Sequence, residues 1–385
     1  MEKPLNTDLY NQDHETFRAS VRGFVERQVV PNLERWDADR AVDRETWRMA
    51  GKQGLLGLAV PEEYGGAGET DYRFRVVIQE EIARVGASAL QSGFSTNDDI
   101  VLSYLLRHAD DAQRRRWLPS FVDGSTIGAI AMTEPGAGSD LRSIRTTATR
   151  SGGDWIINGA KTFITSGVLC DVVIVFARTE GAGGFSLFLV EDGTEGFRRG
   201  RKLDKMGLAA QDTAEQFFDD VRVPAANLLG EQGAGFSYLM RSLPLERLGI
   251  AVAAQASAEA VFEWTTSYVN QRKAFGKRII DMQGPGFILA ELQTAIEVSR
   301  AYIDRCVRAH NRGELSAVDA AKAKYWATEL QGRVTDAGVQ LHGGYGYMME
   351  YPVAKAFIDA RIQRIYGGTN EIMKEIIRRD LIETP

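Results

Sequence analysis

The sequence has few of the residues on which metal and disulfide chemistry depend. Its 385 residues include only two cysteines, Cys170 and Cys306, which stand far apart in unrelated contexts. A disulfide framework is therefore unsupported, and a reducing compartment is expected. The histidines, which show no metal-ligand spacing with one another or with a cysteine, are His14, His108, His310 and His342. We expect no metal site and no cysteine nucleophile.

Net positive charge and long apolar runs are also missing. The formal charge is −6, which disfavours non-specific binding to nucleic acid or to an anionic membrane surface. No apolar run approaches the length that crosses a bilayer, and the N-terminal MEKPLNTDLYNQDHE has no apolar core of a signal peptide. We expect a cytoplasmic protein without a membrane span, whose partners are small molecules or other proteins.

What the chain does have is enough apolar residues, 44%, to pack two or three subdomains. From about residue 8 to 121 the signals are helical, with Phe17, Val21 and Val29 on one predicted helix face and Pro31 ending or kinking that helix. From about 126 to 229 the pattern is typical of strands. We therefore place domain boundaries at 1–125, 126–233 and 234–385.

Within the predicted β domain, Asn158-Gly159 lies between β-prone runs and indicates a hairpin. The C-terminal part predicts long helices at 238–272, 283–311 and 318–341, joined by short connections that favour a helical bundle. The fold class is thus α+β and multi-domain: a helical N-terminal domain, a central β domain and a C-terminal bundle.

Glycine-rich segments are the most distinctive local feature. The segment AMTEPGAGSD (131–140) offers backbone N–H groups and hydroxyls to a polar or anionic ligand, although such loops are more often plain turns. A Rossmann interpretation fails, because these glycines lead into another β region rather than into a helix. GEQGAGF (230–236) is interpreted as a plain connection between a strand and a helix.

Three other segments each allow two interpretations. QRKAFGK (271–277) and QLHGGYGY (340–347) are either helix termini with solvated charges or parts of a ligand site. In LPLERLGIA, Glu246 is either an acid near a helix N-terminus, where it compensates the macrodipole, or a partly buried base. In IYGGTNEI, Gly367 and Gly368 indicate a tight turn or the close approach of a ligand.

Taken together, these segments resemble the acyl-CoA dehydrogenase family of flavoproteins. The resemblance runs along nearly the whole chain in the family's order, through PEEYGGAG, MTEPGAGSD, NGAKTFITSG, DKMGLAAQDTAEQFFDDVRVP, GEQGAGF, QRKAFGK, QLHGGYGY and YGGTNEI. The fold it implies, with a C-terminal four-helix bundle, agrees with the pattern above. Within the family, the sequence resembles the long-chain type most, and this resemblance implies a role in fatty acid β-oxidation.

The resemblance implies one FAD per subunit, touched by a neighbouring subunit of a homo-oligomer, typically a tetramer. Around the flavin ring and ribityl chain it implies Met132, Thr133, Ser139, Phe163 and Thr165. Against the diphosphate and adenosine, across a subunit interface, it implies Arg272, Phe275, Gln283, Gln340 and Gly344, with Thr369 and Glu371 on the flavin side of the terminal loop. Phe163 departs from the tryptophan of many members but keeps an aromatic ring.

The resemblance also implies the catalytic groups. Many members carry their catalytic glutamate directly after the tyrosine of the terminal loop, where this chain has Gly367; a smaller set carries it in an LERL-like segment, as Glu246 is here. The Gly367 N–H would then reach the thioester carbonyl. Ser139, Arg247, Tyr366 and Gly368 are the further residues implied to contact substrate, with Arg247 at the CoA moiety.

The implied reaction is α,β-desaturation of an acyl-CoA thioester, by loss of an α-proton to Glu246 and of a β-hydride to FAD. A long straight chain is the first expectation for the acyl group. Branched or shorter chains, as in isovaleryl types, and acyl groups on a carrier protein are the alternatives, since a few apolar substitutions change a pocket's preference. The implied electron acceptor is an electron-transfer flavoprotein. A member that passes its electrons to oxygen, and an acyl-CoA-binding protein without activity, are further alternatives.

Overall fold

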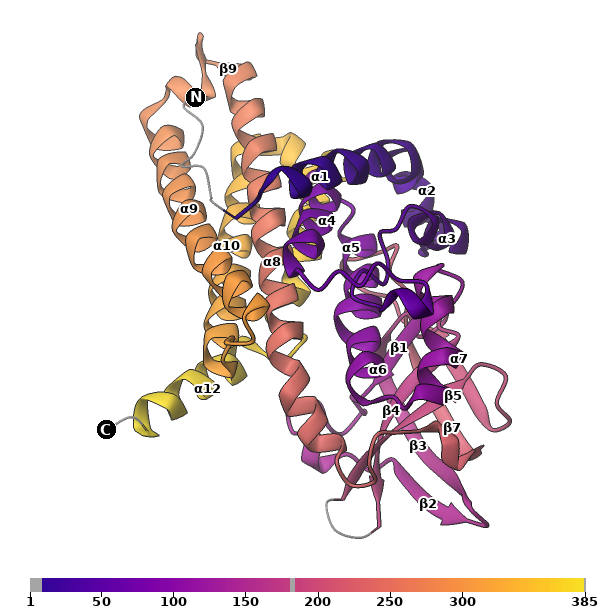
Figure 1. Cartoon of the computed structure of the whole chain (residues 1–385). Helices are drawn as coiled ribbons and strands as arrows, with labels where there is room; N and C mark the ends of the chain where they lie inside the picture. Colours follow the sequence, from indigo (N-terminus) through magenta and orange to yellow (C-terminus); the bar gives the residue numbers. More distant parts are fainter. Residues whose placement is uncertain (1–8, 181–183, 384–385) are drawn as a thin grey trace.

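Helices make up the N-terminal part of the chain. The computed structural model describes residues 9–180 and 184–383 (Figure 1). The helices before the sheet are α1 (Gln12–Phe24), α2 (Leu33–Asp39), α3 (Arg44–Lys52), α4 (Tyr72–Arg84), α5 (Ser88–Ser95), α6 (Ser103–His108) and α7 (Asp111–Val122). A π-helical segment, η4 (Thr96–Leu102), joins α5 to α6 without a break. The helical pattern predicted for this part of the chain is confirmed.

Pro31 interrupts regular α-helix as expected. The chain leaves α1 through a π-helical turn, passes through a 3-10 turn that contains Pro31, and only then enters α2. A proline has no N–H to donate, so regular α-helical bonding cannot continue through it. Val21 and Val29 are fully buried on the predicted face.

The middle of the chain forms a β domain. Its strands are β1 (Gly128–Ala131), β2 (Thr147–Ser151), β3 (Asp154–Thr165), β4 (Val172–Thr179), β5 (Phe185–Glu191), β6 (Phe197–Lys202), β7 (Thr213–Val223) and β8 (Leu228–Leu229). They form one sheet in the order β6-β7-β3-β2-β4-β5-β8, with β1 paired to β4. Only β1 and β2 pair with β4 in parallel among the described strands; the other pairs are antiparallel.

Both faces of the central strands are buried, which explains their unbroken apolar sequence. In β4, Ile174 and Phe176 pack with residues of α6 and α7, including Phe121. The alternate residues of the same strand, such as Val175, pack on the other face with Trp155. Helices of the N-terminal part thus cover one side of the sheet and fix the position of its strand ends.

The hairpin predicted at Asn158-Gly159 is wrong. These residues lie inside β3, where the register with β7 shifts, and the turn between β2 and β3 is formed by Gly152 and Gly153 instead. A Cβ at Gly159 would lie 2.3 Å from Thr146 Oγ1, so glycine serves close packing here rather than a turn. Asn158 Nδ2 donates a hydrogen bond to Asp220 Oδ1 across this irregularity, at 2.9 Å.

The C-terminal part is a helical bundle. It consists of α8 (Gly235–Gln271), α9 (Gln283–Asn311), α10 (Ala317–His342), α11 (Pro352–Ala360) and α12 (Asn370–Glu383). A small hairpin, β9 (Lys273–Ala274) and β10 (Lys277–Arg278), joins α8 to α9. The long helices match the predicted ranges closely. The fourth position of the bundle is shared by the shorter α11 and α12, which both pack against α10.

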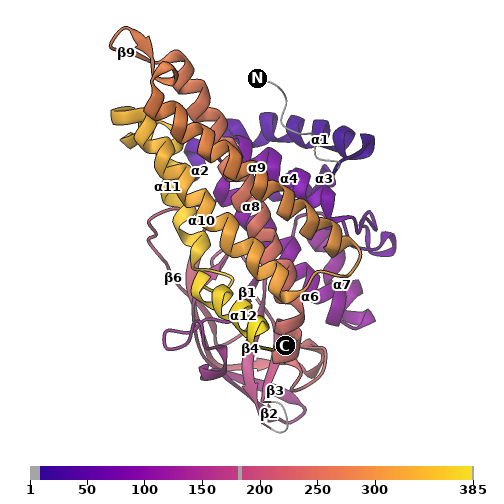
Figure 2. The same ribbon diagram turned by 90° about the vertical axis from the view of Figure 1, so that its left-hand side faces the viewer.

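The long bundle helices run side by side, and β9 stands at the end that lies away from the β domain (Figures 1 and 2). Helix α8 also contacts α4 and β5, so it links the bundle to both other parts. Within the described ranges, no helix combines the length and apolar character needed to cross a bilayer.

Gly124 provides a test of this packing. It has φ +73, and an added Cβ would lie 2.1 Å from the Trp47 carbonyl oxygen, whereas Gly54 has φ +72 with no atom within 4 Å of its Cβ position. We expect Gly124→Ala to cost about 2 kcal/mol more than Gly54→Ala, because only the first adds a clash to the left-handed strain. Thermal unfolding of both variants measures this difference, and equal losses would contradict it.

Candidate active site

A cavity of about 160 Å³ opens where the three parts of the chain meet. Its walls come from α5 and η4, from α8, from β1 and β3, and from the loop before α12. The predicted site residues that line it are Met132, Thr133, Phe163, Thr165, Glu246, Tyr366 and Gly367. Residues far apart in the sequence therefore meet at one place, and both groups predicted to be catalytic are among them.

Glu246 is a buried carboxylate in the interior of α8. The helix begins at Gly235, so Glu246 is outside the first turn, and the macrodipole interpretation is wrong. Its side chain is 5% exposed, and Tyr104 donates a hydrogen bond to its Oε1 at 3.1 Å. Burial raises the pKa of Glu246 to about 7, against the opposing effects of the Tyr104 bond and the charges of Arg247 and Arg107. A carboxylate with this pKa can accept a proton near neutral pH.

The terminal loop requires its two glycines. Gly367 and Gly368 have φ values of +63 and +89, which residues with side chains rarely adopt. A Cβ on Gly367 would lie 2.4 Å from Cδ1 of Ile250, one turn after Glu246 on α8. The absence of a side chain at position 367 thus lets the loop approach α8 beside the carboxylate.

Arg247 lies beneath this loop rather than in open solvent. It is 6% exposed, and its Nε donates a long hydrogen bond, 3.5 Å, to the Gly367 carbonyl oxygen. Burial lowers the pKa of Arg247. The position supports a role in holding the loop, and its predicted contact with CoA stays a prediction.

The loop from Met132 to Asp140 is anchored by a buried ion pair. Lys161 Nζ donates to Glu134 Oε1 and to the Met132 carbonyl oxygen, both at 3.0 Å. Glu134 also accepts the N–H groups of Arg145 and Thr146. Burial lowers the pKa of Lys161 to about 8. The anchor fixes Met132 and Thr133 at the cavity mouth.

The side chains exposed at the mouth of the cavity suit a cofactor with a flat ring system and a polar chain. Phe163 has φ +59, a costly backbone conformation for a residue with a side chain, and its ring is 68% exposed and open to a packing partner. Thr133 and Thr165 bring hydroxyls to the same cavity. Ser139 is exposed and outside the cavity lining, farther along the same loop. An aromatic face beside hydroxyl donors suits a flavin ring and its ribityl chain.

The residues predicted for the diphosphate and adenosine lie elsewhere, at the far end of the bundle. Arg272, Gln340 and Gly344 line a separate cavity of about 700 Å³. Phe275, at the tip of the β9–β10 hairpin, is 97% exposed with φ +52, and Gln283 is exposed at the start of α9.

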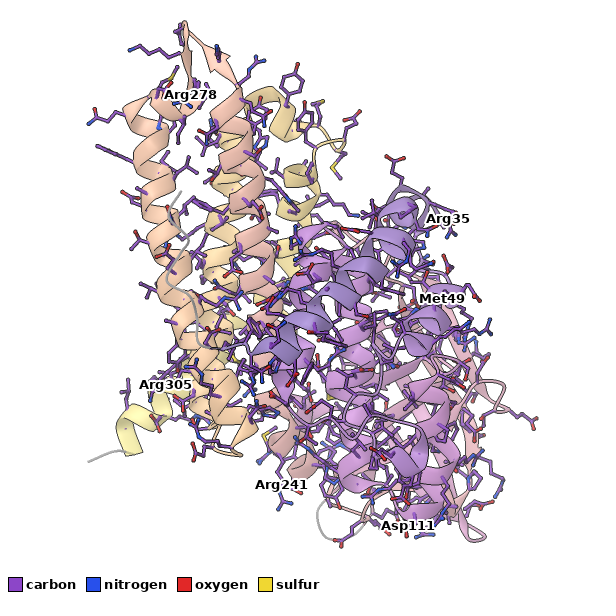
Figure 3. The ribbon with its side chains drawn as sticks, turned by 45° about the horizontal axis from the view of Figure 1, so that its top comes forward. Arg35, Met49, Asp111, Arg241, Arg278 and Arg305 are labelled. Atoms are coloured by element: carbon purple, nitrogen blue, oxygen red, sulfur yellow. The ribbon has the colours of Figure 1, made fainter. Side chains whose placement is uncertain are left out.

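The distance between the two groups is large. Arg272 caps α8 and stands 26 residues from Glu246, which corresponds to about 39 Å along a helix. Figure 3 shows the two ends of this region, with Arg278 by the β9–β10 hairpin and Arg241 toward the opposite end of α8. A single chain therefore does not bring the two groups around one molecule.

Three predicted residues lie beside the cavity without lining it. Gly368 follows Gly367 in the loop, and Thr369 precedes α12, where its Oγ1 accepts the Ile372 N–H at 3.4 Å. Glu371 is exposed in the first turn of α12. Neighbouring charge and hydrogen bonds lower its pKa.

The sequence interpretation missed Tyr104 and Lys324. Lys324 is fully buried on α10 and donates to the Gly368 carbonyl oxygen at 2.8 Å. A signal for it exists in the helical periodicity, since Lys324 falls one turn after Ala320 and one turn before Thr328 on the buried face of α10. For Tyr104, nothing local distinguishes a hydrogen-bonding tyrosine from a core tyrosine.

Comparison with known proteins places this site in a family. The family models for the N-terminal, middle and C-terminal domains of acyl-CoA dehydrogenase match residues 11–125, 129–221 and 233–382. The chain is 51% identical over 379 residues to the mitochondrial long-chain specific acyl-CoA dehydrogenase of Sus scrofa, covering 97% of this chain and 87% of the relative. It is 35% identical to mitochondrial isovaleryl-CoA dehydrogenase of Pongo abelii, with 96% and 88% covered.

Solved structures agree. An acyl-CoA dehydrogenase from Geobacillus kaustophilus has a TM-score of 0.95 at 46% identity, covering 98% of this chain and 100% of that one. A Mycobacterium smegmatis glutaryl-CoA dehydrogenase in complex with FADH2 has a TM-score of 0.92 at 29% identity, with 98% and 96% covered. A structure described as an electron transferring flavoprotein of Acidaminococcus fermentans scores 0.93 at 34% identity, with 98% and 100% covered.

The fold and the cavity thus define a flavin-dependent dehydrogenase of acyl thioesters. The chain belongs to the acyl-CoA dehydrogenase family, whose members are FAD flavoproteins. The predicted fold class, enzyme class and cofactor are confirmed.

The Lys161–Glu134 anchor can be tested directly. We expect Lys161→Met to lower the free energy of unfolding by about 3 kcal/mol, because it leaves a buried carboxylate without its cation. The loosened loop should also retain less FAD, measured as the ratio of flavin to protein absorbance after gel filtration. Lys52→Met, at an exposed lysine, is the control, and flavin retention equal to that of the control would contradict the anchor.

Proposed function

We propose that this acyl-CoA dehydrogenase acts on long straight-chain acyl-CoA thioesters and uses Glu246 as its catalytic base. The observation that carries the proposal is a buried carboxylate with a pKa of about 7, opposite a loop that has no acid at position 367. A base at 246 and a glycine at 367 complement each other, since the reaction needs one catalytic base.

The reaction removes two hydrogens from adjacent carbons. Glu246 accepts the α-proton as its carboxylate becomes the neutral acid, and the electron pair left behind forms the new carbon–carbon double bond. FAD, when bound, supplies the hydride acceptor for the β-carbon. The Gly367 N–H donates to the thioester oxygen and stabilises the negative charge that develops there. Met132, Thr133, Phe163 and Thr165 would hold the flavin.

Preference for a long chain is supported by the relatives and by the wall of α8. Identity to the long-chain specific relatives is far higher than to the isovaleryl relatives. Within the cavity, α8 presents Gly249 and Ala253 after Glu246, and these small residues leave room for an extended chain. Isovaleryl-like substrates and carrier-bound acyl groups are the alternatives that the experiment below separates.

Assembly with a second copy follows from the split cofactor site. Arg272 lies 26 residues, about 39 Å along a helix, from Glu246 in the cavity. Phe275, Gln283, Gln340 and Gly344 lie with Arg272 at that far end of the bundle, so a neighbouring chain would supply them to each FAD. We propose a homotetramer. An electron-transfer flavoprotein is the proposed electron acceptor. A cytoplasmic location stays a prediction, while the long-chain specific relatives are named as mitochondrial.

Anaerobic titration of the purified flavoprotein tests the substrate. We expect palmitoyl-CoA to bleach the flavin absorbance and isovaleryl-CoA to leave it nearly unchanged. Bleaching by isovaleryl-CoA alone would move the assignment to branched chains, and flavin absorbance unchanged by either thioester would point to carrier-bound substrates.

Glu246→Gln tests the catalytic base. This variant should bind FAD and acyl-CoA normally yet lose about 1,000-fold or more in kcat, since it removes the base. Glu263→Gln, exposed on the same helix, is the control.

The pH dependence of turnover tests the environment of Glu246. Its carboxylate must be ionised, so kcat should rise with pH through about 7. Tyr104 donates to the ionised form, and Tyr104→Phe should raise the pKa of Glu246 and move this rise about one unit to higher pH. Tyr302→Phe, which removes a bond to Asp319 in the bundle, is the control. A rise that stays in place in Tyr104→Phe would contradict the assignment.

A further inference from the structure

Lys324 is a buried cation for which the reaction described so far has no use. It lies on α10 with 0% of its surface exposed, on a helix face that carries Ala320, Ala323 and Ala327. Burying an ammonium group is costly unless a carboxylate pairs with it. Within residues 9–180 and 184–383, no carboxylate oxygen lies within ion-pair distance of Lys324 Nζ. The Lys324 charge is therefore compensated only from a longer distance, by Glu371 and Glu329.

The hydrogen bonds of Lys324 all lead to the terminal loop. Its Nζ donates to the Gly368 carbonyl oxygen at 2.8 Å and to Asn370 Oδ1 at 2.9 Å. Asn370 is the first residue of α12, and its Nδ2 donates to Thr328 Oγ1 at 3.0 Å. Lys324 thus fastens the end of the glycine loop and the start of α12 to α10.

A second buried cation holds the preceding carbonyl. Arg247 contacts the Gly367 carbonyl oxygen, so the consecutive carbonyls of Gly367 and Gly368 are each held by a positive side chain from a different helix. The charge of Arg247 also acts on Lys324: burial first and Arg247 second lower the pKa of Lys324 to about 7, against the opposing charges of Glu371 and Glu329. The N-terminus of α12 adds a positive dipole end at the same place.

We propose that Lys324 is a positioning residue for proton abstraction. By holding the Gly368 carbonyl, it fixes the flexible Gly367–Gly368 segment so that the Gly367 N–H faces the thioester oxygen. Together with Arg247, it places positive charge behind the loop, where it stabilises the negative charge that develops on that oxygen. This inference rests on the proposed function, and Lys324 does not line the cavity, so it acts only through the loop.

The surroundings of Lys324 differ from those expected of a lysine with a purely structural role. A loop that needed only to be fastened could use the bonds that Asn370 Nδ2 already donates to Thr328 Oγ1 and to the Glu329 carboxylate, at 3.0 and 2.8 Å. A buried lysine charge next to a second cation, with Glu371 and Glu329 acting on it only from a longer distance, destabilises the folded chain. It becomes useful when negative charge appears nearby, as it does in the transition state.

The experiment compares Lys324→Met and Lys324→Gln with wild type as FAD-loaded enzymes. For Lys324→Met we expect kcat with palmitoyl-CoA to fall about 10- to 100-fold with KM little changed, because the interaction serves the transition state. Lys324→Gln keeps a donor for the Gly368 carbonyl but no charge, so its kcat should lie between those of wild type and Lys324→Met. Arg300→Met, which removes a buried cation of the α4–α8–α9 contact, is the control for loss of stability.

A second measurement reads the stabilised charge without turnover. A long-chain acyl-CoA with sulfur in place of the β-carbon can lose its α-proton but has no β-hydride to give. Its enolate, bound beside oxidised flavin, is followed by long-wavelength absorbance during a pH titration. In Lys324→Met we expect the apparent pKa of the bound α-proton to rise by about one to two units.

The outcomes separate the two proposals. Wild type that is not reduced by any acyl-CoA would remove the proposed function and this inference with it. Active wild type with an unchanged kcat and α-proton pKa in Lys324→Met would overturn this inference alone. A change in KM only would do the same, as would unfolding of both Lys324 variants, because either result would make Lys324 a structural residue.

Discussion

The burial of Glu246 is the constraint on which the rest of the site depends. A solvated glutamate titrates near 4.5 and is a weak base toward a carbon acid, whereas burial raises the pKa of this one to about 7. That burial requires protein on every side: α8 carries the residue through the junction of the three parts of the chain, and η4 leads into Tyr104 across from it. The carboxylate is therefore a product of the domain arrangement rather than of its own helix.

The glycine loop complements this carboxylate from the opposite direction. An acid at 367 would need the space that Ile250 occupies, and the left-handed backbone there excludes ordinary side chains. Because neither glycine of the loop has a side chain, the backbone there can adopt many conformations. Its geometry therefore depends on contacts with other elements. Arg247 and Lys324 impose it through successive carbonyls, and they do so from two helices that pack firmly against each other.

The parts of this structure that follow local rules could be predicted from the sequence, and those that follow tertiary contacts could not. The ends of α8, α9 and α10 were predictable because periodicity and breaker residues coincide there. The prediction of a turn at Asn158-Gly159 was wrong, since a dipeptide that favours a turn also allows another segment to pack closely against its glycine. The contact of Gly159 with Thr146 exists only in the folded structure and could not be read from the sequence. Glu246 could be identified through the resemblance, but its burial, and the contact with Tyr104, depend on residues 142 positions apart.

The length of α8 connects chemistry with assembly. One helix carries the proposed base about a third of the way along and, at its C-terminal end, the first of the residues proposed for the adenosine half of the cofactor. Because a rigid helix cannot fold back on itself, the proposed assembly has these two groups serve different FAD molecules, so that each complete site would draw on two chains. Phe163 and Phe275, both left-handed and both exposed in the single chain, are the strained residues that such a pairing would cover. In the proposed assembly, burial of these two rings against cofactor and partner chain would offset the cost of their backbone conformation, so flavin binding and assembly would stabilise each other.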